Sequence, residues 1–135
     1  NRAAEAAAGE AFDVFAGVIR SLTIQDAFDV LNGPPDAATS LFKARASDEL
    51  RERFLPVVTG SMEEVGLYRT YEDLVARYNA IPLVRPVEFD LEMYIVDETM
   101  SGLFSTLEQE EARIREDPLA RTTALLQRVF GTLDA

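Results

Sequence analysis

The stretch that decides the fold is residues 90–116, DLEMYIVDETMSGLFSTLEQEEARIRE. Its apolar residues recur at steps of three and four, which predicts one long amphipathic helix. Asp90 is in place to cap its start, and we expect the helix to end near Glu116. The predicted apolar face consists of Met93, Val96, Met100, Leu103, Phe104, Leu107 and Ile114. A helix of this length needs other helices against which to bury that face.

Capping residues, glycines and prolines divide the rest of the chain into further helices. The sequence predicts them at about 1–22, 23–32, 36–46, 47–65 and 70–81, and a last helix begins at Pro118. The expected N-caps are Thr23 (with Asp26 completing a capping pair), Asp36, Ser47, Thr70 and Asp117. Pro56 predicts a kink or a restart of the helix at 47–65. In the first helix, Phe12, Phe15, Val18, Ile19 and Leu22 form the expected apolar face.

Only residues 81–89, IPLVRPVEF, are expected to be extended, because proline disfavours helix in the residue before it. The sequence thus predicts an all-α fold, with a compact single domain over residues 1–135. It has about six to seven helices of unequal length, which is not the pattern of a simple four-helix bundle.

The chain is strongly acidic: 24 Asp and Glu against 13 Lys and Arg give a net charge of −11. This field repels phosphate backbones and anionic bilayers, so we predict no nucleic-acid partner and no basic membrane anchor. No apolar run has the roughly 18 residues of a membrane span, so no transmembrane segment is expected.

The absence of cysteine and histidine excludes thiol catalysis, histidine-assisted serine nucleophiles and metal sites built from these ligands. No Gly-rich phosphate loop or EF-hand pattern occurs. We therefore predict no catalytic residues, no metal site and no cofactor. Two-carboxylate acid/base chemistry stays open as an alternative, because acids are abundant.

The densest group of charges is EEARIREDPLAR, residues 110–121. Glu111 falls on the apolar face of the long helix and Glu110 at its edge, so Glu111 needs a cationic partner. Arg115 lies four residues on, and Arg121 lies in the predicted last helix. One interpretation is an arginine cluster that recognises an anion or ligand. The other is an ion-paired corner, with Asp117 capping the last helix, that holds the last two helices together.

Tyr68, Tyr71 and Tyr78 form a second candidate group, before and within the helix predicted at 70–81. They could line a groove for a peptide or an aromatic ligand. The alternative is that they are residues at the edge of the core with solvated hydroxyl groups.

The order of several motifs resembles a known family. The motifs are NRAAEAA, IRSLTIQDAFDVLNG, AATSLFK, SDELRERFLPVV, MEEVG, AIPLV and LEMYIVDETMSGLFSTLEQEEARIREDPLARTTALLQRVFG. In this order they are similar to the bacterial domain-of-unknown-function family 4197 over nearly the whole chain. Members are typically longer at the N-terminus and often begin with an export signal. The resemblance therefore implies a periplasmic or cell-envelope location and a further N-terminal segment. It implies no activity.

Our leading hypothesis is a non-enzymatic helical binding or assembly module of the bacterial envelope, with a protein partner or an oligomer. The alternative is a helical carrier with an internal pocket for an apolar or amphipathic small ligand. The weaker alternative is a carboxylate-dependent hydrolase or lyase.

Overall fold

The computed structural model describes residues 2–86, 89–117 and 131, and within these residues it contains helices and no strand. The helices are α1 (Arg2–Arg20), α2 (Ile24–Asn32), α3 (Ala37–Val65), α4 (Leu67–Asn79) and α5 (Leu91–Glu116). The all-α prediction is confirmed. The described residues hold five helices, where six were predicted for the same part of the chain. The helix predicted after Pro118 lies outside the described residues.

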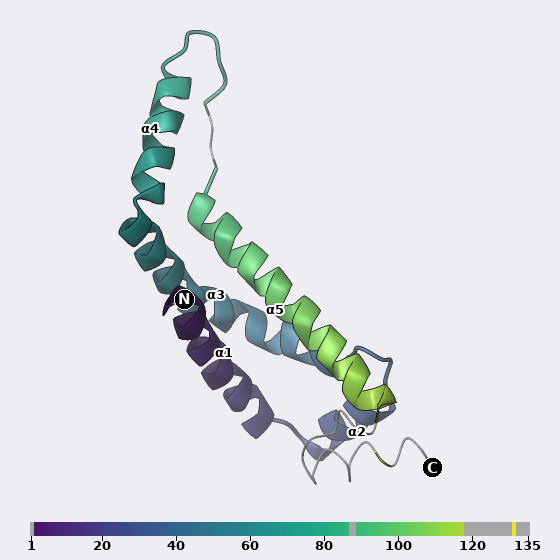
Figure 1. Ribbon diagram of the computed structural model, residues 1–135. Helices are drawn as coiled ribbons and strands as arrows, with labels where there is room; N and C mark the ends of the chain where they lie inside the picture. Colours follow the sequence, from purple (N-terminus) through teal and green to yellow (C-terminus); the bar gives the residue numbers. More distant parts are fainter. Residues whose placement is uncertain (1, 87–88, 118–130, 132–135) are drawn as a thin grey trace.

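The difference in helix number comes from α3, which joins the helices predicted at 36–46 and 47–65. Ser47 is not a cap. Its hydroxyl donates to the carbonyl oxygen of Lys43 inside the continuous helix, a bond that serine makes in helix interiors. The helix also continues through Pro56, so of the kink or restart predicted there, the restart does not occur. Figure 1 shows α3 changing direction along its length.

Most of the other predicted helix ends are confirmed. Thr23 and Asp26 form the expected capping box at α2, with both reciprocal bonds at 3.0 Å. Asp90 caps α5 by accepting from the amide of Met93 at 3.1 Å. The N-cap predicted at Thr70 is wrong, because α4 begins at Leu67. The Thr70 hydroxyl instead donates to the carbonyl oxygen of Gly66 at 3.1 Å.

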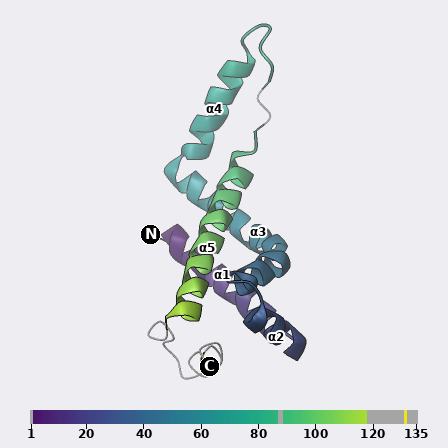
Figure 2. The same cartoon turned by 90° about the vertical axis from the view of Figure 1, so that its right-hand side faces the viewer.

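Helix α3 is the central element, and both α1 and α5 pack along it (Figures 1 and 2). Leu50 and Phe54 of α3 are almost fully buried and meet the buried residues of its two neighbours. The buried core consists of Ala11, Val14, Val18, Ala46, Leu50, Phe54, Val58, Met62, Val96, Met100 and Phe104. The face predicted for α5 supplies Val96, Met100 and Phe104 of this core.

The face predicted for α1 is partly wrong. Phe12 is 73 % exposed and Ile19 is 55 % exposed, whereas Ala11 and Val14 are buried. Phe15 stays at the interface, where its ring centroid lies 5.0 Å from that of Phe42.

Helix α4 and the loop after it project away from the body formed by α1, α2, α3 and α5. Both views show this projection (Figures 1 and 2). We call residues 67–86 the arm. The segment predicted to be extended is not extended throughout, because a turn occupies residues 81–84, closed by the amide of Val84 donating to the carbonyl oxygen of Ile81 at 3.5 Å.

Candidate functional site

The charged corner is built by the last turns of α5. Glu111 and Arg115 are four residues apart, so their side chains lie on the same side of the helix. The Arg115 guanidinium donates to Glu111 Oε2 from Nε at 3.0 Å and from Nη2 at 2.8 Å. Both side chains are buried, with 7 % and 9 % of their surface exposed. The structure therefore brings together these two predicted residues as a buried ion pair.

Glu111 also caps a helix that begins far away in the sequence. Its carboxylate accepts hydrogen bonds from the backbone amides of Ala38 and Thr39, each at 2.8 Å, and from the Thr39 hydroxyl at 2.8 Å. These amides belong to the first turn of α3, where a helix has no carbonyl partners of its own to offer. Asp36 occupies the N-cap position as predicted, but its side chain makes no capping bond. The Glu111 carboxylate from α5 caps the helix instead.

Arg115 makes the corresponding contacts at the end of α2. Its Nη2 donates to the carbonyl oxygen of Val30 at 2.7 Å, and its Nη1 donates to that of Leu31 at 3.3 Å. The last carbonyls of a helix are unpaired and carry a partial negative charge, so a cation is favourable there. The ion pair thus joins α5 to the C-terminus of α2 and to the N-terminus of α3.

The electrostatics of Glu111 follow from these contacts. Burial on its own would raise the pKa of this carboxyl group. The bonds from the Thr39 and Ala38 amides, the Thr39 hydroxyl and Arg115 outweigh burial, and the pKa of Glu111 lies below its ordinary value. The group is therefore a carboxylate at neutral pH, with its oxygens engaged by structural donors.

The other residues of the predicted corner are placed differently. Glu110 is exposed and pairs with Arg113, whose Nη1 lies 2.8 Å from Glu110 Oε1. Asp117 occupies the C-cap of α5, where its amide donates to the carbonyl oxygen of Arg113 at 2.9 Å. Arg121 and the last helix lie outside the described residues, and so does the predicted link between the last two helices. The described corner joins α5 to α2 and α3.

The predicted tyrosine group is only partly assembled. Tyr71 lines a groove of about 630 Å³ between α4 and the start of α5, where its hydroxyl donates to the carbonyl oxygen of Phe89 at 3.5 Å. Tyr78 is exposed and does not line that groove. The side chain of Tyr68 lies outside the described residues.

The aromatic contacts at this groove include two residues that the sequence reasoning missed. The ring centroid of Phe89 lies 6.2 Å from that of Tyr71 and 5.5 Å from that of Tyr94. The loop between α4 and α5 separates Tyr71 from Phe89 and Tyr94, so periodicity within one helix could not group all three. Phe89 and Tyr94 are nevertheless close to half exposed.

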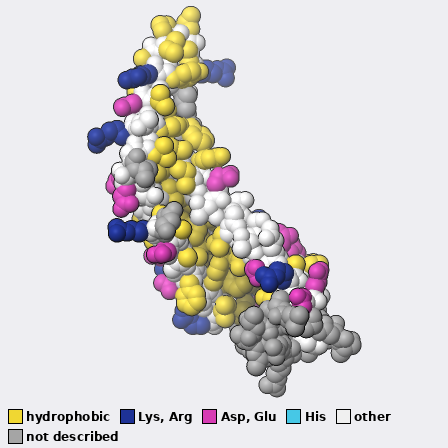
Figure 3. Space-filling view, in the orientation of Figure 1, with side chains coloured by type: hydrophobic (Ala, Val, Ile, Leu, Met, Phe, Trp, Pro, Cys, Tyr) yellow, Lys and Arg dark blue, Asp and Glu magenta, His cyan; other side chains and the backbone are white. Residues whose placement is uncertain are grey.

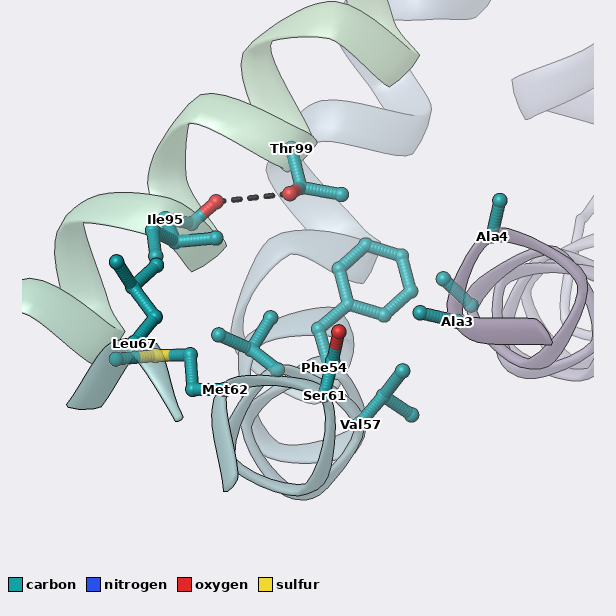
Figure 4. A pocket seen from close by; sticks show the side chains of 11 residues that line it. Ala3, Ala4, Phe54, Val57, Ser61, Met62, Leu67, Ile95 and Thr99 are labelled. Carbon is teal, nitrogen blue, oxygen red and sulfur yellow. Dashed lines mark hydrogen bonds between the residues drawn. The ribbon is translucent and has the colours of Figure 1, made fainter. Parts of the chain in front are cut away.

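A second cavity, the apolar groove, has a volume of about 310 Å³ and lies between the start of α1, the second half of α3 and α5. Figure 4 shows Ala4, Phe54 and Ile95 around it, one from each helix. Thr99 contributes little polarity, because its hydroxyl donates to the carbonyl oxygen of Ile95 at 2.8 Å. Leu67, the first residue of the arm, also lines the groove. The groove therefore meets the arm at the arm's base.

The arm itself carries an unusual amount of exposed hydrophobic surface. Its large apolar side chains with 46–107 % exposure are Leu67, Leu74, Tyr78, Ile81 and Leu83. Figure 3 shows hydrophobic side chains from the tip of the arm down to the body. No helix in the described part of the chain is both long and apolar enough to cross a bilayer. Helical spacing places Leu74, Tyr78 and Ile81 on one side of a helix, but it does not indicate that this side would be left uncovered.

Comparison with known proteins bears on the chain as a whole. No curated protein and no solved structure matches it. Residues 1–131 match the family described as protein of unknown function (DUF4197). The match covers nearly the full length and agrees with the order of motifs in the sequence. The chain therefore belongs to the DUF4197 family.

Proposed function

We propose that this chain is a non-enzymatic helical binding or assembly module of the bacterial cell envelope, and that it binds its partner through the arm. The observation that carries the proposal is the set of large hydrophobic side chains exposed together on the arm. A contiguous exposed apolar surface is typical of interaction sites, because it is unfavourable in water until a partner covers it. The envelope location rests on the export signal that members of this family often carry.

The charged corner supports the same proposal indirectly. The Glu111 carboxylate accepts five hydrogen bonds from the protein, which leaves it poorly placed to recognise a ligand. Of the surfaces considered above, the arm is then the better candidate for binding. The described residues give no observation in favour of the hydrolase or lyase alternative, and we do not propose it.

Retention by the envelope fraction of a bacterial lysate tests the proposal. The immobilised chain is compared with a double variant of the arm, Leu74→Gln with Ile81→Gln. Phe12→Gln is the control, because Phe12 is a large apolar residue that is even more exposed, at 73 % against 60 % for Leu74 and 50 % for Ile81, but lies on α1. We expect the double variant to lose at least about tenfold in retention, since each substitution removes hydrophobic burial at the interface. Equal retention of the double variant and the parent would refute a binding role for the arm.

The apolar groove favours a second candidate function, a carrier of an apolar or amphipathic small ligand. Its volume of about 310 Å³ is at the lower end of the range for small-molecule sites. Ala4 lines it, and a phenyl ring at this position would fill it, whereas Ala6 is exposed on the same helix and outside the groove. Binding of the dye ANS should fall in Ala4→Phe and persist in Ala6→Phe. Equal dye binding by both variants would exclude the groove as the site.

A further inference from the structure

The tip of the arm combines backbone strain with exposure. In the turn at residues 81–84, Pro82 is the second residue and Leu83 is the third. Leu83 has a φ of 65°. The third position of such a turn ordinarily takes glycine or asparagine, because other side chains are strained at positive φ. The Leu83 side chain is also fully exposed. Leu83 thus has an unfavourable backbone conformation and an unfavourably exposed side chain. No packing contact in the described structure compensates for either.

The charge of the arm is opposite to that of the rest of the chain. Residues 67–86 contain three arginines against two acids, a net charge of +1, so the other 115 residues carry −12. The last thirteen residues of the arm, 74–86, include Arg77 and Arg85 and no acid at all. Figure 3 shows basic side chains on both sides of the hydrophobic tip. The tip is therefore an apolar projection flanked by cations.

We infer that the tip of the arm inserts into the surface of an anionic lipid bilayer. Ile81 and Leu83 would enter the boundary of the acyl chains, and Tyr78 would lie at the level of the headgroups, where tyrosine is enriched. Arg77 and Arg85 would contact lipid phosphates, which guanidinium groups bind well. This inference rests on the proposed function, since it names the partner of the same surface.

The net charge of the whole chain predicted repulsion from such a membrane, but the distribution of charge changes that expectation. The thirteen residues of α4 span about 20 Å at the rise of an α-helix, and the arm projects away from the acidic body (Figure 1). Exposed charges separated by more than about 8 Å are largely screened at physiological salt. The arm can thus reach the bilayer while most of the acidic surface stays beyond effective range.

The shape of the tip favours a bilayer over a second copy of this chain. A single fully exposed leucine at the apex of a turn is convex, so a fluid surface that opens around it can cover it. Two tips that faced each other in a dimer would bring cations together. Docking of the basic arm onto the acidic body of another copy is the competing arrangement, and the experiment below separates the two.

The test is co-sedimentation with vesicles of phosphatidylcholine and phosphatidylglycerol, compared with vesicles of phosphatidylcholine alone. Leu83→Asn is the decisive variant, because asparagine tolerates positive φ and removes the hydrophobic group without breaking the turn. We expect the parent to bind the anionic vesicles, and Leu83→Asn to lose about tenfold or more in partitioning with an unchanged or higher Tm. Phe12→Gln is the control and should bind like the parent.

Two further variants test the mechanism of binding. Arg77→Gln with Arg85→Gln should remove most of the preference for anionic vesicles and most of the salt dependence of binding. The chain has no tryptophan, so Leu83→Trp introduces a single fluorescent reporter at the tip of the arm. Its emission should shift to shorter wavelength when anionic vesicles are added.

Each remaining outcome counts against the inference in a different way. Vesicle binding that is the same in Leu83→Asn and the parent would overturn it. If the parent binds the envelope fraction through the arm but binds neither kind of vesicle, the partner is a protein and only the proposed function stands. If neither the envelope fraction nor the vesicles bind, both proposals fail. A dimer in light scattering that Leu83→Asn dissociates, without vesicle binding, would assign the arm to a second copy.

Discussion

Replacing Glu111 by alanine removes one carboxylate that holds three helices at the same point. The variant leaves the Ala38 and Thr39 amides and the Thr39 hydroxyl without their acceptor. It also removes the Glu111 carboxylate from the Arg115 guanidinium, which is only 9 % exposed. The two carbonyl oxygens at the end of α2 stay within reach of Arg115, but they carry no full negative charge.

Removing one partner of a buried ion pair typically costs about 3–5 kcal/mol, because the remaining charge is buried and uncompensated. Each buried donor left unpaired would add about 1–3 kcal/mol if no water replaced the carboxylate. Water that enters the space left by the side chain offsets part of this loss, so we expect a total loss of about 3–5 kcal/mol. Glu110→Ala is the matched control, because it breaks only an exposed pair with Arg113 and should cost less than about 1 kcal/mol.

Urea unfolding followed by far-UV circular dichroism measures the difference. With a slope of about 1–3 kcal/mol per molar urea, the midpoint of Glu111→Ala should fall by at least about 1 M relative to Glu110→Ala. If the protein does not fold with alanine, Glu111→Gln keeps an acceptor and should give a smaller, measurable loss. Adding Arg115→Met to Glu111→Ala should recover part of the stability, because it also removes the buried charge that paired with Glu111. Equal midpoints for Glu111→Ala and Glu110→Ala would refute the account of the corner.

The remaining predictions concern pH and packing. The pKa of Glu111 is lowered in the folded protein. The contribution of this carboxylate to stability is therefore present above about pH 4 and is lost as the pH falls through the lowered pKa. The urea midpoint of Glu111→Gln should accordingly fall less steeply with acidification than that of the parent. Gly33→Ala should lower the Tm, because the added Cβ would lie 2.6 Å from a backbone carbonyl oxygen of α2. Gly60→Ala is the contrasting variant, because a Cβ at this position has no neighbouring atom within 4 Å, and it should raise stability by about 0.5–1 kcal/mol. Leu50→Ala should cost about 2–5 kcal/mol in urea unfolding, since Leu50 is fully buried; a loss below about 1 kcal/mol would contradict the assignment of α3 as the central helix.

The sequence predicted the helical class and most helix ends, and the two N-caps that it misplaced share one physical cause. Ser47 and Thr70 were both interpreted as N-caps, yet each hydroxyl donates to the carbonyl oxygen four residues earlier inside a helix or at its first turn. A hydroxyl can serve either role with the same neighbours in sequence. Thr23 differs because Asp26 completes a reciprocal capping box. A single serine or threonine does not identify an N-cap, whereas the two reciprocal bonds of a capping box do.

The sequence predicted only the contact of the charged corner that lies within one helix. Helical spacing indicates that Arg115 can reach Glu111, and the structure has this pair. The amides of Ala38 and Thr39 are 73 and 72 residues away from Glu111, and no pattern in one sequence connects them. The prediction therefore named the charged residues of the corner but assigned it to the last two helices instead of to α2 and α3.

The arm was missed for a different reason. Periodicity shows that Leu74, Tyr78 and Ile81 can share a face, but it does not show whether another helix covers that face. In the structure α4 extends beyond its neighbours, and these side chains remain exposed. Helical periodicity also gives no information on the conformation of Leu83. Pro82 favours the second position of a turn, but leucine is not typical of the third.

The cap that Glu111 supplies to α3 has a consequence for the order in which the chain folds. Ala38 and Thr39 are synthesised before Glu111, so the first turn of α3 leaves the ribosome without the acceptor of its amides. Its ends are expected to fray until α5 is made, because unsatisfied amides at a helix start favour solvent. Contacts of such long sequence separation are slow to form, because the chain between them must first be closed into a loop. Closure of this corner would then mark the completion of the helical body, and chains that stop before residue 111 would lack the contact that fixes α2, α3 and α5 together.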